Sequence, residues 1–124
     1  MALQISAETL QQYRQTANTR YLADRDRRDR RYERAWRPAE QAASLMRERY
    51  GVDQVVAFGS LTHPDRFTLW SDVDLAAWGL TENNWLRAMG DVRALADDID
   101  INLVDMACCS PELAASILRD EVVP

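Results

Sequence analysis

Two short apolar runs constrain the fold of this chain more than any other feature. Polar residues follow the first run and lie within the second. The first run, residues 55–58, is mostly β-branched or aromatic and leads directly into Gly59-Ser60. After an interval of eleven residues, Asp72 and Asp74 lie one residue apart within the second apolar run. Runs of this length and composition are typical of buried strands, so the sequence predicts two strands of one sheet.

The polar residues of these runs indicate phosphate and metal chemistry. Gly59 permits backbone angles and close approaches that a Cβ would prevent, and Ser60 adds a hydroxyl and a backbone N–H, which suits a phosphate-binding turn. Side chains alternate along a strand, so Asp72 and Asp74 project from the same face. Adjacent carboxylates repel unless a cation lies between them, and such oxygen ligands favour Mg²⁺ shared with substrate phosphates.

The order of these residues resembles the pattern of the polymerase-β-type nucleotidyltransferases, in which a strand ending in Gly-Ser precedes a strand containing Asp-x-Asp. From residue 39 to the C-terminus, the chain is similar to the minimal nucleotidyltransferases that act as antitoxins of HEPN ribonuclease toxins. This resemblance implies Mg²⁺ in a two-metal arrangement at Asp72 and Asp74, and ATP with its triphosphate at Gly59 and Ser60. It also implies transfer of AMP from ATP to a tyrosine hydroxyl of a cognate HEPN toxin.

Two residues of the interval are further candidates for nucleotide binding. Ser71 immediately precedes the first aspartate, and Arg66 is the only arginine of the interval and the best candidate for a triphosphate contact. Relatives often carry an arginine-rich start to this interval, whereas this chain does not, so Arg66 is equally compatible with a plain surface position. His63, the single histidine, is expected to be a solvated loop residue.

The third acidic residue of the family pattern is replaced in this chain. Family members carry it on the strand after the intervening helix, and the matching position here is Asn102. An asparagine offers a neutral oxygen to a metal but accepts no proton, so Asp100, on the same strand face, is the candidate catalytic base. One alternative is therefore an antitoxin that neutralises its toxin by binding alone. A second is a small-molecule enzyme of the aminoglycoside nucleotidyltransferase type, although those enzymes usually add a second domain for the acceptor.

Charge is distributed unevenly along the 124 residues, which contain no lysine. Residues 1–37 hold nine arginines and five acidic residues, a net charge of +4, whereas residues 38–124 hold six arginines and fifteen acidic residues, a net charge of −9. We therefore expect an arginine-rich helical arm at 1–37 and a minimal nucleotidyltransferase domain at 38–124, whose acidity argues against direct nucleic-acid binding. The helix predicted over residues 7–36 is either a solvated or partly disordered arm or a partner-docking helix.

The remaining segments predict an α/β (α+β) fold, a small mixed sheet with helices packed on one face, preceded by the long N-terminal helix. Strands are expected at 54–58, 71–78 and 100–106, and further helices at 39–50, at 82–96 and from 111. Arg37-Pro38 is expected to break or restart the helix. No apolar run approaches membrane-spanning length and no signal peptide begins the sequence, so we expect a cytoplasmic protein without membrane contact.

Overall fold

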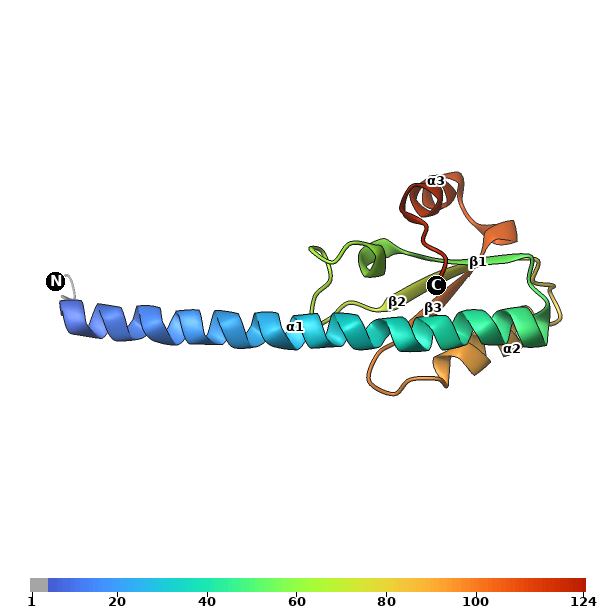
Figure 1. Ribbon diagram of the computed structural model, residues 1–124. Coiled ribbons are helices and arrows are strands. Elements are labelled where there is room, and N and C mark those ends of the chain that lie inside the picture. Colours follow the sequence, from blue (N-terminus) through green and yellow to red (C-terminus); the bar gives the residue numbers. More distant parts are fainter. Residues whose placement is uncertain (1–4) are drawn as a thin grey trace.

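The computed structural model describes residues 5–124 and arranges them as a three-stranded sheet with three α-helices and two short 3₁₀ helices (Figure 1). In chain order the elements are α1 (Ala7–Tyr50), β1 (Gln54–Phe58), η1 (Gly59–Thr62), β2 (Val73–Trp78), α2 (Trp85–Arg93), β3 (Ile101–Asp105), η2 (Met106–Cys108) and α3 (Pro111–Asp120). This architecture confirms the predicted fold class.

The sheet has the strand order β1-β2-β3, so β2 is central, as its nearly continuous apolar sequence predicts. β1 runs antiparallel to β2, and β3 runs parallel to β2. The register pairs Phe58 with Asp74 and pairs Asp74 with Asn102. The end of β1, a carboxylate of β2 and an amide of β3 therefore lie in one row across the sheet.

The main core lies between one face of the sheet and the helices α1 and α2. Ala39, Ala42 and Ala43 of α1 are fully buried, and their small side chains let the helix backbone approach the strands closely. Larger side chains from α1, the strands and the β1–β2 connection fill the remaining space. The largest that are fully buried are Phe67, Met46, Leu61, Leu75 and Ile101. These contacts fix the C-terminal half of α1 against the sheet.

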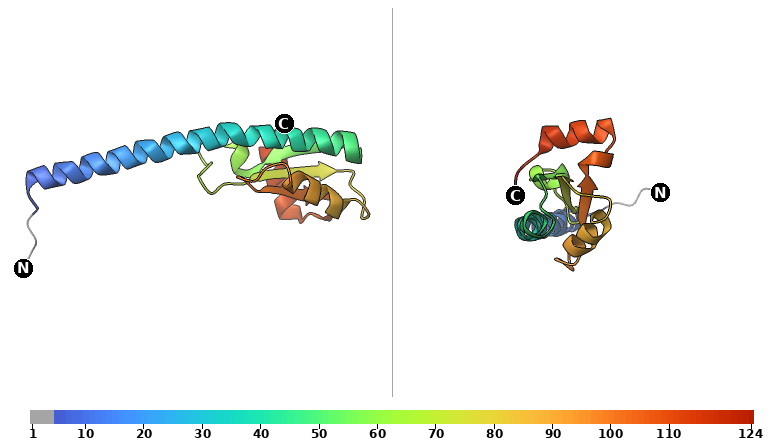
Figure 2. Two further views of the ribbon diagram at one scale, coloured as in Figure 1. Left: turned by 90° about the horizontal axis from the view of Figure 1, so that it is seen from below. Right: turned by 90° about the vertical axis from the view of Figure 1, so that its right-hand side faces the viewer.

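The opposite face of the sheet is covered by α3, which is visible on the far side of the sheet from α1 in Figure 2. Ile117 of α3 is fully buried against Val56, Phe58 and Ala76. The expectation that the helices pack on one face thus holds for α1 and α2 and is wrong for α3. The physical reason is that β1 and β2 carry apolar side chains on both faces, so both faces require a cover.

α1 is one continuous helix, and the predicted break at Arg37-Pro38 is wrong. It begins after Ser6, whose Oγ accepts a hydrogen bond from the Thr9 backbone N–H at 3.1 Å, and it ends at Gly51 in the left-handed conformation. Pro38 lies inside the helix and is buried with the core-facing alanines on either side of it. Their packing holds the helix together although proline lacks a backbone N–H, and Figure 2 shows the helix curving gently rather than breaking.

The N-terminal part of α1, residues 7–27, extends beyond the body of the protein (Figure 1), and we call it the projecting segment. Almost all of its side chains are exposed. Its charged side chains pair along the helix itself, Asp26 with Arg30 and Asp24 with Arg27. α1 is long but charged, and within residues 5–124 no helix is apolar enough over sufficient length to span a bilayer.

Candidate active site

The two aspartates and the asparagine singled out from the sequence lie together. Asp72 directly precedes β2, Asp74 lies within it, and Asn102 lies opposite Asp74 on β3. The Asn102 Nδ2 group donates a hydrogen bond to Asp74 Oδ1 at 3.1 Å and a longer one to Asp72 Oδ2 at 3.4 Å. One amide therefore links both carboxylates.

Asp74 is a half-buried carboxylate with a second carboxylate, Asp72, beside it. Burial raises the pKa of Asp74, the charge of Asp72 raises it further, and the hydrogen bond from Asn102 partly opposes both effects. A cation beside the pair would reverse the shift, because it favours the charged form of both carboxylates. The two carboxylates thus repel each other, and a cation between them would relieve that repulsion.

Gly59, directly after β1, lies against Asp74. Its φ angle is +72°, in the region that favours glycine, and a Cβ built on it would lie 2.8 Å from Asp74 Oδ2. Gly59 is therefore required both by backbone conformation and by the approach of the carboxylate. η1 begins at this glycine, so the turn that includes the half-buried Ser60 lies directly beside the aspartates.

Asp100 and Ser71 border the same region in different ways. Asp100 is exposed; together with Asp72, Trp70 and Arg31 it lines a hollow of about 330 Å³, and its backbone carbonyl accepts a hydrogen bond from the Val73 N–H at 2.9 Å. Ser71 Oγ accepts a hydrogen bond from the Thr68 N–H at 2.9 Å. The Ser71 hydroxyl thus closes the loop before β2, while the Asp100 carboxylate remains available at the edge of the hollow.

Arg31 is the residue of this region that the sequence interpretation missed. Its Nη2 donates to the Ser71 carbonyl at 2.9 Å and its Nη1 donates to the Asp98 carbonyl at 3.0 Å. The arginine therefore ties α1 to both loops that flank the aspartates. Its position one helical turn before the buried Ala35 was the available signal, but the surrounding run of charges predicts a solvated segment.

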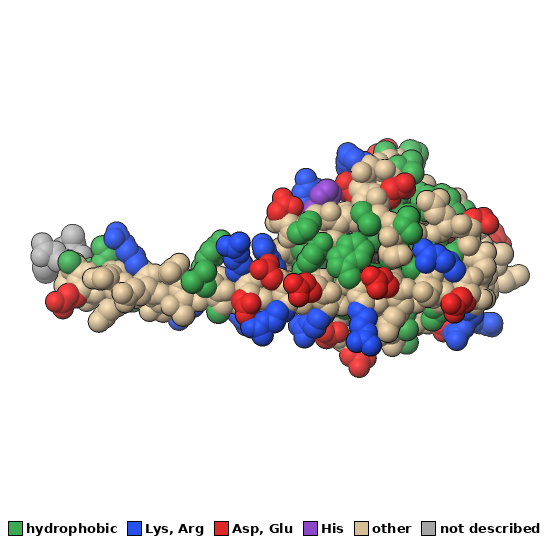
Figure 3. Space-filling view, in the orientation of Figure 1, with side chains coloured by type: hydrophobic (Ala, Val, Ile, Leu, Met, Phe, Trp, Pro, Cys, Tyr) green, Lys and Arg blue, Asp and Glu red, His purple; other side chains and the backbone are tan. Residues whose placement is uncertain are grey.

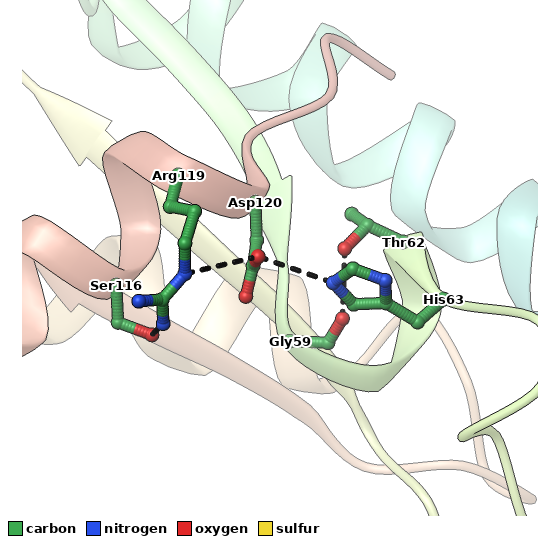
Figure 4. A network of polar contacts seen from close by, with 6 residues as sticks. All are labelled: Gly59, Thr62, His63, Ser116, Arg119 and Asp120. Carbon is green, nitrogen blue, oxygen red and sulfur yellow. Dashed lines mark hydrogen bonds and ion pairs between the residues drawn. The ribbon is translucent and has the colours of Figure 1, made fainter.

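The structure does not bring Arg66 to the carboxylate pair. Arg66 is exposed in the β1–β2 loop, and its charge acts instead on Asp120 at the end of α3. His63 was expected to be solvated, but it is half-buried and its Nε2 lies 3.1 Å from Asp120 Oδ1 (Figure 4). This contact connects the end of the η1 turn to α3.

The side chains at the carboxylate pair offer oxygen donors of the kind that Mg²⁺ prefers. Asp72 and Asp74 supply carboxylate oxygens, and a rotated Asn102 amide would supply a neutral oxygen in place of its NH₂ group. Within residues 5–124, no three His, Cys, Asp or Glu side chains are grouped to hold a metal ion.

Comparison of the sequence with models of known protein families and with curated proteins finds no match. A function for this chain is therefore inferred from the geometry of Gly59, Asp72, Asp74 and Asn102.

Proposed function

We propose that this chain is a nucleotidyltransferase that transfers AMP from ATP to a hydroxyl group. The observation that carries the proposal is the contact of a glycine turn with the amide-linked aspartates: Gly59 approaches Asp74 too closely for a Cβ, and Asn102 bonds to Asp72 and Asp74. The turn suits a phosphate group, and the carboxylates suit Mg²⁺. Mg·ATP requires both features side by side.

In this proposal, the turn at Gly59 and Ser60 holds the triphosphate with backbone N–H groups and the serine hydroxyl. Asp72, Asp74 and the Asn102 oxygen would hold Mg²⁺, which when bound neutralises charge on the phosphate oxygens. Arg31 keeps the loops around Asp72 in place through its two carbonyl contacts, so the carboxylates are positioned before the substrate arrives.

The transfer is a displacement at the α-phosphorus of ATP. The acceptor oxygen forms a bond to the α-phosphorus. The bond between the α-phosphorus and the oxygen that bridges to the β-phosphate breaks, and pyrophosphate leaves with that electron pair. The proton of the acceptor hydroxyl passes to a carboxylate. Asn102 cannot accept it, so we assign this role to Asp100, which shares the hollow beside Asp72.

The acceptor in this proposal is a tyrosine of a cognate HEPN ribonuclease toxin, as the resemblance of the sequence implies. An attached AMP adds negative charge and bulk where the toxin must bind RNA, which is sufficient to prevent that binding. The alternative is an antitoxin that acts by binding alone. Asn102 favours this alternative, because its amide stabilises both carboxylates without any cation.

Intact-mass measurement of the cognate toxin after incubation with this chain, ATP and Mg²⁺ tests the proposal. We expect AMP-sized increments with the wild-type chain and a greater yield with Asn102→Asp, which adds a metal-binding carboxylate. Asp100→Asn should lower the transfer rate about 10²- to 10⁴-fold, the typical contribution of a general base. Asp65→Asn, which removes an exposed loop carboxylate, is the matched control and should leave the rate unchanged.

A neutralised toxin that carries no adduct from the wild-type chain would overturn nucleotidyl transfer and leave the binding alternative. The metal site is tested separately by calorimetric titration of Mg·ATP. Asp72→Asn should abolish Mg²⁺-dependent binding, and unchanged affinity would show that the aspartates do not hold the cation.

A further inference from the structure

The two outer edges of the sheet differ in how the chain covers them. The edge of β1 pairs with the C-terminal segment, because Ala57 and Val122 exchange backbone hydrogen bonds of 2.7 and 2.9 Å. The edge of β3 has no such partner among residues 5–124. Figure 2 shows β3 on the side of the sheet away from β1, with α2 toward one face and α3 toward the other. An uncovered strand edge presents backbone groups with which another extended segment can pair.

The pairing of β3 with β2 identifies the backbone groups at this edge. The Val73 N–H donates a hydrogen bond to the Asp100 carbonyl at 2.9 Å, and in a parallel pair alternate residues of one strand bond to the same neighbour. The even-numbered residues of β3 therefore direct their backbone groups to β2, whereas Leu103 and Asp105 direct theirs away from it. Within residues 5–124, the Leu103 N–H and C=O and the Asp105 N–H make no other backbone hydrogen bond.

A groove of about 470 Å³ lies at this edge. Leu103 packs into the core with α1 and α2, and Val104 packs into the cluster with α3, so the two side chains point to opposite faces of the sheet. Both residues nevertheless line the groove, which therefore lies along the strand edge itself. Its walls come from the segments at the starts of α2 and α3 and carry Glu82, Trp85, Cys109 and Leu113.

The two walls of the groove differ in chemistry. On the α3 side, Val104 and the 37% exposed Leu113 offer apolar surface. On the α2 side, the exposed Glu82 lies with Trp85, and strand alternation places the Asp105 side chain on the same side. A carboxylate and an indole ring both attract a cationic side chain. Successive residues of an extended segment point to opposite sides, so an apolar residue next to a basic one matches both walls.

Charge also decides between a foreign segment and a second copy of this chain. None of the described residues that line the groove is basic, and α1, which carries most of the arginines (Figure 3), contributes nothing to the lining. Two β3 edges paired with each other would bring Glu82 and Asp105 of one copy toward the same carboxylates of the other. This repulsion opposes a second copy, whereas the same carboxylates attract a basic segment.

We propose that the edge of β3 is a docking site for an extended segment of a partner protein in which apolar and basic residues alternate. The segment adds a fourth strand to the sheet beside β3. It bonds to the N–H and C=O of Leu103 and accepts a hydrogen bond from the Asp105 N–H, while its apolar side chain packs on Leu113 and its basic side chain lies beside Glu82. Neither nucleotide nor metal takes part, so the inference is independent of the proposed nucleotidyl transfer.

A fluorescent peptide in which lysine and valine alternate is the probe, and its binding to the full chain is measured by fluorescence polarisation. We expect saturable binding with a Kd of about 10–100 μM that weakens with added salt. The matched control is the same peptide with every backbone amide N-methylated, which keeps the side chains and the charge but has no backbone N–H to donate. This control should bind at least about ten-fold more weakly.

Amide hydrogen exchange followed by NMR locates the bound peptide. The N–H groups of Leu103 and Asp105 should exchange more slowly when the unmethylated peptide is bound, because they gain acceptors. The N–H groups of Asn102 and Val104 face β2 and should keep their exchange rates, so they are controls within the same strand.

Two pairs of substitutions test the walls of the groove. Leu113→Gln should weaken binding of the peptide about five-fold, whereas Leu118→Gln, at an exposed residue of the same helix outside the groove, should not change it. Glu82→Gln should weaken binding about two- to five-fold, and Glu48→Gln, at an exposed residue of α1, is its control.

Several outcomes overturn the proposal. They are absence of binding at about 1 mM peptide, equal binding of the methylated peptide, and unchanged exchange at Leu103 and Asp105. Slower exchange at these two residues without peptide, as the concentration of the chain rises, would assign the edge to a second copy and overturn the basic partner. A chain that binds the peptide but transfers no AMP would refute only the proposed nucleotidyl transfer.

Discussion

Replacing Gly59 with alanine is the most direct test of the contact on which the candidate site depends. Alanine at φ +72° costs about 1–2 kcal/mol, because its Cβ approaches the neighbouring carbonyl. The same Cβ would lie 2.8 Å from Asp74 Oδ2, so the carboxylate must move, which adds roughly 0.5–1.5 kcal/mol if it leaves its preferred rotamer. We expect Gly59→Ala to lower the free energy of unfolding by about 2–3 kcal/mol, or Tm by roughly 6–15 °C.

Two other glycines separate these contributions. Gly51 has a φ of +59°, and a Cβ at this residue would have nothing within 4 Å, so Gly51→Ala should show the backbone cost alone. Gly90 lies inside α2 with open space around it, and Gly90→Ala should stabilise the protein by about 1 kcal/mol. Urea unfolding followed by circular dichroism measures all three.

The decisive comparison is between Gly59→Ala and Gly51→Ala. Combining Gly59→Ala with Asp74→Ala removes the carboxylate that the new methyl group meets, so the two substitutions should be less than additive by roughly 0.5–1.5 kcal/mol. If Gly59→Ala costs no more than Gly51→Ala, and the double variant is additive, the glycine does not touch Asp74 and the proposed phosphate turn is not joined to the metal site.

The charged contacts lead to three further predictions. Burial and the charge of Asp72 raise the pKa of Asp74, so the contribution of Asp74 to stability is lost as pH rises through that pKa. Asp74→Asn should remove this loss and make the protein more stable at neutral pH. Urea unfolding across the acidic range measures the effect. The contact with His63 lowers the pKa of Asp120, so the contribution of Asp120 to stability is present above the ordinary carboxyl pKa and is lost as pH falls through the lowered pKa. Asp120→Asn should therefore make the Tm less dependent on pH over that acidic range. Arg31→Met keeps the aliphatic stem but removes both donations to carbonyl oxygens, and should cost about 1.5–3 kcal/mol in urea unfolding, whereas the exposed control Arg34→Met should cost little.

The strands and their order were predictable because local sequence and burial agree there. β1 begins and ends where its β-branched and aromatic run predicts, and β2 is central because apolar residues occupy both of its faces. The helices were less predictable. α2 begins at Trp85 rather than near Glu82, and Leu86 near its start is 73% exposed, because Ala88 and Val92 make the contacts with the core.

Long-range contacts explain the larger differences from the sequence prediction. Proline predicts a helix break at residue 38, but the core-facing alanines on both sides of it pack against the sheet and keep one helix. The role of Arg31 depends on carbonyl groups 40 and 67 residues away in the sequence, so no local pattern contains it. The meeting of Asp72, Asp74 and Asn102 was predictable, since strand parity and one parallel pairing are sufficient to define it.

Asn102 has opposite consequences for stability and for chemistry. With an aspartate at this position, three carboxylates would face one another, and without a cation their repulsion would oppose folding. The asparagine replaces that repulsion with hydrogen bonds of 3.1 and 3.4 Å to the two remaining carboxylates. The same amide must rotate before its oxygen faces a cation, and it cannot take a proton. In the proposed function, the chain would therefore bind metal against that hydrogen bonding and would need Asp100 for proton transfer. The stability of the carboxylate pair and the rate of the proposed nucleotidyl transfer would be opposed at this one residue.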